Sequence, residues 1–161
     1  MARQLAAALA GLTTGIYVLT VRAGERQHGM SSSWATQVSG VPVLIMAAVD
    51  QQHVTHQMVL QSGAFALNIV GTQSKHLEDY FYSPQSRQPD NLAPFALEIG
   101  RTGTPLLQDA LASLDCHLVS TRSPWPCKAP TVAARTPPRR TLRPSAVPRP
   151  RTEARCRCSV L

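Results

Sequence analysis

A short run of mostly small residues, closed by an aromatic, has the composition of a surface that holds a flat, phosphorylated ligand. Small side chains let such a ligand lie against backbone amides, while hydroxyl groups and the start of a helix can receive a phosphate. The residues concerned are Gly29, Met30, Ser31, Ser32, Ser33 and Trp34, with Thr55 and His56 further along the chain. This pattern favours the binding of a nucleotide cofactor.

Each of these residues also has an ordinary structural interpretation when it is taken alone. The serines fit a barrel strand, Trp34 fits a hydrophobic core, and His56 fits the solvated face of a helix. Other kinds of chemistry find less support, because the serines lack a Gly-x-Ser-x-Gly context and no order of histidine and aspartate indicates a catalytic triad. The four cysteines lack the paired spacing of a zinc site, so no metal is expected.

The hydrophobic pattern predicts short strands mixed with a few helices, without the alternation of strand and helix that a parallel sheet requires. Strands are expected at residues 15–21, 28–34, 43–49, 64–70, 96–99 and 110–119, and helices around 5–12, 54–61 and 74–82. Gly63 is expected to end the second helix, and the continuously apolar segment 43–49 is expected to be buried on both faces. The predicted fold is mainly β (α+β), an antiparallel barrel with short flanking helices. The candidate residues then lie on one strand with its following loop and at the start of the second helix.

The 161 residues suffice for one domain, and the positive charge of the chain is concentrated at one end. Of the formal net charge of +7, residues 1–120 hold six Lys and Arg against eight Asp and Glu, whereas residues 121–161 hold ten against one. A slightly acidic body has no electrostatic footprint for nucleic acid, and no apolar stretch approaches the ~20 residues that cross a bilayer. With Cys116 as the one cysteine of the body, the sequence fits a reduced, cytoplasmic protein that binds neither nucleic acid nor membrane.

Residues 121–161 differ in composition from the body. They hold eight of the thirteen prolines and no Gly, Ile, Phe, Tyr or His. Such a segment buries too little apolar surface to offset its ordering entropy, so it is expected to be a disordered Arg/Pro-rich tail after a domain of residues 1–120. Two accounts stay open: a genuine basic arm, or a coding segment translated out of frame, which the G/C-rich codons of its residue types favour.

Five parts of the chain agree in order and spacing with one known family. They are residues 12–20 (LTTGIYVLT), 29–39 (GMSSSWATQVS), 53–56 (HVTH), 62–69 (SGAFALNI), and 103–107 (GTPLL) with 114–116 (LDC). Over about residues 5–120 the chain resembles the flavin reductase-like family of FMN-binding split barrels. The resemblance implies a split-barrel domain that is incomplete at its C-terminal end.

The resemblance also implies a role for each candidate residue. In the segment that Gly29 opens, the isoalloxazine and ribityl side would be lined by Met30, Ser31, Ser32 and Ser33, and Trp34 would flank the ring. Val49 and Asp50 would lie against the ligand, and Thr55 and His56 would receive the phosphate. Tyr80 would either approach the flavin or pack with Phe81. Many family members carry a basic residue near His53. The histidine here implies a phosphate affinity that is weaker or sensitive to pH.

Membership of that family would make the chain an NAD(P)H:flavin oxidoreductase that uses FMN, with FAD as an alternative, forms a homodimer and supplies a downstream flavin or electron acceptor. The choice between NADH and NADPH, and between a bound and a released flavin, stays open. The chain departs from the family at one motif. Family members carry a Gly-Asp-His turn whose histidine lies near the nicotinamide, and at the matching place this chain has residues 120–126 (STRSPWP). The closing strands and this contact are therefore expected to be absent. A non-catalytic flavin carrier or an inactive truncated member is the alternative.

Overall fold

Nine strands, two complete α-helices and two short 3-10 helices form in the part of the chain that the computed structural model describes, residues 9–122 and 131–135. In chain order they are β1 (Tyr17–Ala23), β2 (Arg26–Ser32), β3 (Ala35–Gly40), β4 (Val43–Ala48), α2 (Val54–Ser62), β5 (Ala64–Ile69), η1 (Thr72–Ser74), α3 (Lys75–Tyr82), η2 (Pro84–Arg87), β6 (Leu97–Ile99), β7 (Pro105–Leu107), β8 (Ala112–Arg122) and β9 (Thr131–Arg135). All of the strand pairs in this part of the chain are antiparallel. The mainly β composition with short helices confirms the fold class expected from the sequence.

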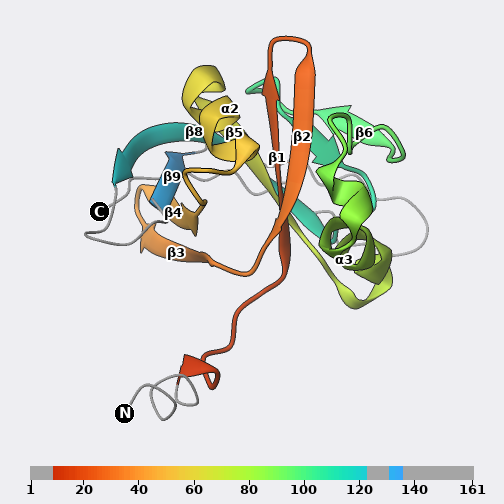
Figure 1. The fold of residues 1–161 in the computed structure, drawn as a ribbon. Coiled ribbons are helices and arrows are strands. Elements are labelled where there is room, and N and C mark those ends of the chain that lie inside the picture. The colour runs from red at the N-terminus through yellow and green to blue at the C-terminus, as the bar shows by residue number, and fades with distance from the viewer. Residues whose placement is uncertain (1–8, 123–130, 136–161) are drawn as a thin grey trace, which may run out of the picture.

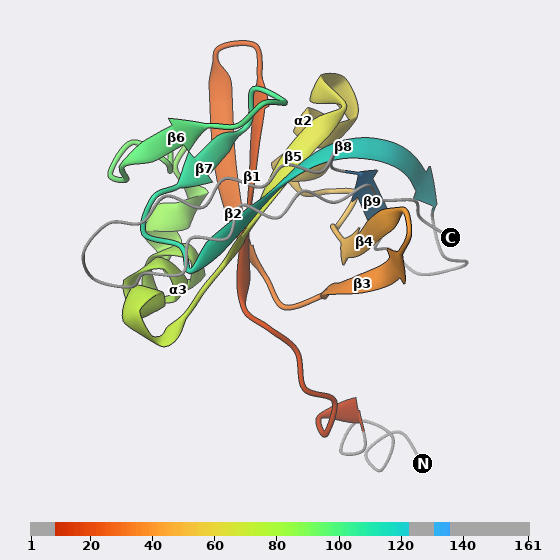
Figure 2. The same ribbon diagram turned by 180° about the vertical axis from the view of Figure 1, so that it is seen from behind.

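Seven strands form one sheet in the order β2-β1-β5-β8-β9-β4-β3, and β6 and β7 form a separate hairpin. Only Ser33 and Trp34 separate β2 from β3, although these two strands lie at opposite edges of the sheet. The sheet must therefore curve until its edges meet at this corner, which produces the split barrel seen in Figure 1 and, from behind, in Figure 2. A hydrogen bond from the Ala48 amide to the Trp34 carbonyl (2.8 Å) ties the corner to the end of β4.

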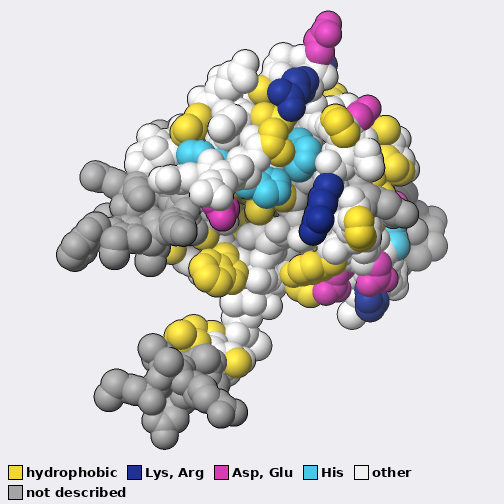
Figure 3. All heavy atoms as spheres, in the orientation of Figure 1, with side chains coloured by type: hydrophobic (Ala, Val, Ile, Leu, Met, Phe, Trp, Pro, Cys, Tyr) yellow, Lys and Arg dark blue, Asp and Glu magenta, His cyan; other side chains and the backbone are white. Residues whose placement is uncertain are grey.

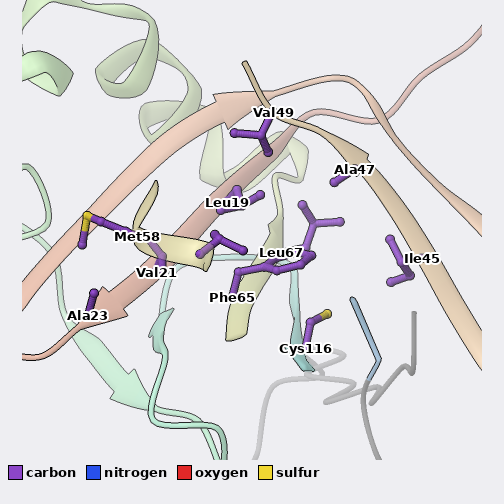
Figure 4. Close-up of a cluster of buried hydrophobic side chains, with 11 residues drawn as sticks. Leu19, Val21, Ala23, Ile45, Ala47, Val49, Met58, Phe65, Leu67 and Cys116 are labelled. Atoms are coloured by element: carbon purple, nitrogen blue, oxygen red, sulfur yellow. The ribbon is translucent and has the colours of Figure 1, made fainter. Parts of the chain in front are cut away.

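Strand β1 is buried on both faces because its side chains alternate between two hydrophobic clusters. Leu19 and Val21 enter the barrel cluster, whose other members include Phe65 and Leu67 and which α2 closes with Met58 and Val59 (Figure 4). Val18 enters the α3 cluster, which is made of Val18, Leu77, Phe81, Leu92 and Leu107. Each fully buried side chain of this size contributes about 1.5–3 kcal/mol. The β1–β2 hairpin is thus held from two sides.

Most of the expected elements are confirmed. Gly24 provides the turn between β1 and β2 with φ of 62°, and Gly63 ends α2 with φ of 67°. Leu77 and Phe81, four residues apart, form the buried face of α3. Ser74 precedes this helix as expected, but its hydroxyl accepts a hydrogen bond from the Gly71 amide (2.8 Å) and does not cap α3.

Strands β3, β7 and β9 were not predicted, and the burial of β4 was predicted wrongly. The residues of β3 are polar or small and largely exposed, so no apolar alternation marks them; pairing with β4 makes them a strand. Strand β7 is only three residues long. In β4 only Ile45 and Ala47 are buried, because one face of the strand lies on the barrel cluster and the other is only partly covered.

The expectation that no closing strand follows residue 120 is also wrong. Strand β8 continues to Arg122, and β9 pairs with both β8 and β4. Within the expected tail, residues 123–130 and 136–161 lie outside the described residues. Residues 1–8, which include the first half of the helix expected around 5–12, lie outside them as well. Residues 121–122 and 131–135 of the expected tail lie in strands. The disorder of its other residues and the domain division at residue 120 stay predictions.

Replacing Gly63 by alanine should lower the free energy of unfolding by about 1 kcal/mol, because an L-residue at φ of 67° is strained. A Cβ at Gly63 would meet no other atom within 4 Å, so the loss reports the backbone alone. Gly40→Ala is the control, since Gly40 also has open space and has no positive φ. Urea unfolding of both variants measures the effect. Equal stabilities of the two variants would contradict the assignment.

Candidate functional site

The pairing of β1 with β2 divides the candidate residues of β2 between the two faces of the strand. Met30 and Ser32 face the barrel cluster and α2, because their partners on β1 pack on that side. Gly29 and Ser31 pair with Thr20 and Val18 and so face α3. The run of small residues is therefore not one continuous side-chain patch.

Gly29 is surrounded by the protein's own atoms. A Cβ at this position would lie 2.7 Å from the ring of Phe81 and 2.9 Å from Leu92. The Gly29 amide donates to Oδ1 of Asn91 (2.8 Å), and its carbonyl accepts from Nδ2 of the same side chain (2.7 Å). The absence of a side chain at Gly29 thus allows α3 and the Asn91 loop to pack closely against β2.

The edge position of β2 leaves a backbone donor at Ser31. In an antiparallel pair, alternate residues direct their amide and carbonyl away from the partner strand. Because Gly29 directs both groups outward to Asn91, the next outward amide belongs to Ser31. The half-buried Ser31 side chain donates to the Phe81 carbonyl at 3.4 Å. Of Met30, Ser31 and Ser32, the three β2 residues expected to line the ring, Ser31 is the one whose backbone amide points outward from the sheet.

The corner between β2 and β3 carries the remaining residues of the run. Ser32 is buried, and its hydroxyl accepts a hydrogen bond from the Trp34 amide (3.2 Å), while Ser33 is half-buried. Trp34 is 71% exposed, so the alternative interpretation of this residue as a core aromatic is wrong. The indole lies on the surface beside the serines.

The start of α2 is organised by a histidine. His53 is the N-cap residue of the helix, and its Nδ1 accepts from the Thr55 amide (3.2 Å). The Thr55 hydroxyl lies 3.0 Å from the same Nδ1 and 3.1 Å from Nδ1 of His28 on β2. Thr55 is fully buried. Both groups through which Thr55 was expected to bind a phosphate are therefore engaged inside the protein.

The other residues expected near the phosphate have different surroundings. Val49 is buried in the barrel cluster, whereas the exposed Asp50 accepts a hydrogen bond from the Gln52 amide (2.9 Å) through its carboxylate. His56 is 9% exposed, and its Nε2 has no hydrogen-bond partner among the described residues. Burial lowers the pKa of His56, against the opposing charge of Asp50. A buried, uncharged and unpartnered nitrogen is a candidate contact for a ligand.

Tyr80 lies apart from this group, at the border of the α3 cluster. Its ring makes edge-to-face contacts with Phe81 (5.1 Å between centroids) and Phe95 (4.8 Å). Aromatic packing, the alternative that the sequence allowed, is present. The approach of Tyr80 to a flavin stays a prediction.

Two residues that connect the site were not selected from the sequence. His28 is 6% exposed and joins β2 to α2 through Thr55, and Asn91 reaches Nε2 of His28 at 3.4 Å. Burial, followed by the charges of His53 and Arg26, lowers the pKa of His28 from 6.5 to about 4. Figure 3 shows histidine side chains gathered on the face formed by α2 and β2. Alternation along β2 could have placed His28 on the Met30 face, but Asn91 lies in a proline-rich loop with no pattern to mark it.

In the described part of the chain, no three His, Cys, Asp or Glu side chains are arranged to hold a metal ion. No helix in that part has the length and hydrophobicity needed to span a membrane.

The family model that matches this chain is the flavin reductase like domain, over residues 9–132. The chain is 31% identical over 120 residues to the NADPH-flavin oxidoreductase of Streptomyces viridifaciens, a match that covers 72% of this chain and 61% of that protein. It is 28% identical over 118 residues to the diflavin flavoprotein A 1 of Synechocystis sp., covering 73% of this chain and 21% of that protein. The chain thus spans less than two thirds of either relative.

A solved structure supports the same grouping. BorF, the flavin reductase component of a bacterial two-component tryptophan halogenase, superimposes with a TM-score of 0.71 at 26% identity, and the match covers 84% of each chain.

The protein should lose stability as the pH falls from about 6.5 toward 4. Because the folded state holds the pKa of His28 near 4, the unfolded chain takes up the proton first. The contribution of the neutral His28 to the free energy of unfolding is present in full above pH 6.5. It is lost progressively below that pH, by about 2 kcal/mol after allowance for solvent screening. Urea unfolding between pH 7 and 4.5 measures the slope.

His28→Asn removes the titrating group, so its stability should change less with pH. His117→Asn, which alters an exposed histidine on β8, is the control and should keep the wild-type slope. Identical slopes for wild type and His28→Asn would show that His28 does not carry the effect.

Proposed function

The chain belongs to the flavin reductase like domain family, and we propose that it is an oxidoreductase that binds FMN and uses NAD(P)H to reduce it. The observation that carries this proposal is the match of the family model to residues 9–132, which includes both the β2–β3 corner and the start of α2. The similarity to an NADPH-flavin oxidoreductase supports the same activity. FAD in place of FMN is compatible with these observations.

The residues around the β2–β3 corner and the first turn of α2 suit a flavin mononucleotide. The outward amide of Ser31 and the small residues up to Trp34 offer donors and space for a flat polar ring. His53 at the helix start and the unpartnered Nε2 of His56 suit a phosphate, together with the positive end of the helix dipole. Thr55 would act through His53, whose ring it holds in place.

When bound, the flavin supplies the redox chemistry, because it accepts a hydride from the nicotinamide and passes the electrons on. The chain's own residues orient the reactants. A fixed amide at Ser31 stabilises negative charge on the polar edge of a ring that it contacts. Trp34, whose amide is held by Ser32, covers the ring and excludes water. No side chain has to act as a nucleophile or a general base.

We also propose that the protein works as a homodimer in the cytoplasm and supplies a downstream acceptor. Trp34 just before β3, Val38 on β3 and Val41 in the turn after it are exposed, and exposed apolar side chains of this kind suit a second copy. Leu9 and Leu12 are exposed on the segment that leads away from the barrel in Figure 1. The buried thiol of Cys116 fits a reducing compartment.

A flavin carrier without turnover is the second candidate. Residues 120–126 (STRSPWP) lack the Gly-Asp-His motif expected near the nicotinamide, which favours binding without hydride transfer.

Purified protein titrated with FMN should quench the flavin fluorescence, and the yellow complex should bleach when NADH or NADPH is added without oxygen. A complex that forms but keeps its colour with both reductants would replace the reductase by the carrier. Protein that binds neither FMN nor FAD would exclude both functions.

Ser31→Pro should raise the Kd for FMN about tenfold, because it removes the outward amide that we assign to the ring. Proline is tolerated on an edge strand where the amide points away from the sheet, so the ladder with β1 is kept. Ser31→Ala is the matched control: it removes the hydroxyl, keeps the amide and should bind FMN like the wild type. Equal affinities of the proline and alanine variants would exclude this contact.

A further inference from the structure

Four side chains from three parts of the chain form one hydrogen-bonded series across β2 and α2. Asn91 lies 3.4 Å from Nε2 of His28, His28 Nδ1 lies 3.1 Å from the Thr55 hydroxyl, and that hydroxyl lies 3.0 Å from His53 Nδ1. Asn91, His28 and Thr55 are buried, and His53 is half-buried. A series of this kind has a direction, which the protons on the imidazole rings determine.

The α2 end of the series determines one direction. The Thr55 amide can only donate, and it donates to Nδ1 of His53, so this nitrogen carries no proton. The Thr55 hydroxyl must then donate its single hydrogen to the same nitrogen. It is left as an acceptor toward His28, and Nδ1 of His28 must carry a proton.

The Asn91 end gives the same result independently. The Gly29 amide donates to Oδ1 of Asn91, which establishes the orientation of the side-chain amide. The NH2 group of Asn91 donates to the carbonyls of Gly29 (2.7 Å) and Ser86 (2.6 Å) and also faces Nε2 of His28. The two carbonyls use both hydrogens of this NH2 group, and an amide nitrogen cannot accept, so a proton on Nε2 of His28 would have no acceptor on this side. On Nδ1 the proton of a neutral His28 has the Thr55 hydroxyl as its acceptor.

We infer that His28 is a positioning residue: held as its Nδ1–H tautomer, it donates to the Thr55 hydroxyl and so directs that hydroxyl onto Nδ1 of His53, which holds the His53 ring with its Nε2 proton available to a phosphate. The inference rests on the proposed function and adds the residue that orients its phosphate end. His53 is thus held, through the Thr55 hydroxyl, by a buried residue of β2.

The charges around His28 agree with a neutral ring. His53, the N-cap of α2, and Arg26 on β2 are the titratable and charged groups that act on it, and the amide of Asn91 faces it from the loop after η2. A second proton on His28 would place Nε2–H against this amide donor. Burial, followed by the electrostatic effect of His53 and Arg26, lowers the pKa of His28 to about 4, so the neutral form prevails at pH 7.

NMR of protein labelled with 15N-histidine reads the tautomers directly, without any flavin. His28 should show a protonated Nδ1 and an unprotonated Nε2, and His53 the reverse, whereas the exposed His117 should exchange between forms. A protonated Nε2 on His28 at pH 7 would overturn the inference.

Measurements of flavin affinity test the proposed role of His28 in phosphate binding. His28→Leu should raise the Kd for FMN about tenfold and leave the Kd for riboflavin, which lacks the phosphate, unchanged. His28→Asn, whose amide can donate from the place of Nδ1, should restore FMN binding, and His117→Asn is the control. A loss for both flavins in His28→Leu, or for neither, would overturn the positioning role. If the wild type binds neither flavin, the proposed function fails, and the role of His53 toward a phosphate fails with it.

Discussion

The two-sided burial of the β1–β2 hairpin is the constraint on which the rest of the structure depends. Side chains alternate along a strand, so β1 sends Leu19 to the barrel cluster and Val18 to the α3 cluster, and its register with β2 imposes the same alternation on β2. That register sends Met30 to one face and Ser31 to the other. It also turns the Ser31 amide to the outer edge of the sheet. The flavin reductase like domain thus obtains a backbone donor at an edge strand from the same pairing that forms its core.

The hydroxyl of Thr55 is the second constraint, because it has one hydrogen and two imidazole neighbours. The hydroxyl must donate one hydrogen bond and accept the other, and this couples β2 to the first turn of α2. A cap made by histidine is unusual beside the serine, threonine, aspartate and asparagine that helices prefer. It places a half-buried imidazole where a plain hydroxyl would offer a weaker group to an anion. The loop at Asn91 completes the arrangement by holding the outer edge of β2.

The sequence predicted the parts of the fold that carry local signals. Its β-branched and aromatic residues marked β1, glycines marked the turn at Gly24 and the end of α2, and a four-residue spacing marked the face of α3. Strand β3 could not be found in this way, because it is a strand only through its pairing with β4. In the site, the serine run was recognisable, but its division between two faces follows from register. His28 and Asn91 meet only after the loop has folded onto β2, and no spacing records that contact.

The central claim is that the outer edge of β2 and the first turn of α2 together receive a flavin and its phosphate. Amide chemical-shift mapping of 15N-labelled protein during addition of FMN tests it most directly. The account predicts that the largest shifts fall on Ser31, Ser33 and Trp34 and on residues 53–56. Shifts confined to the β6–β7 hairpin or to α3, with these two segments unmoved, would contradict it.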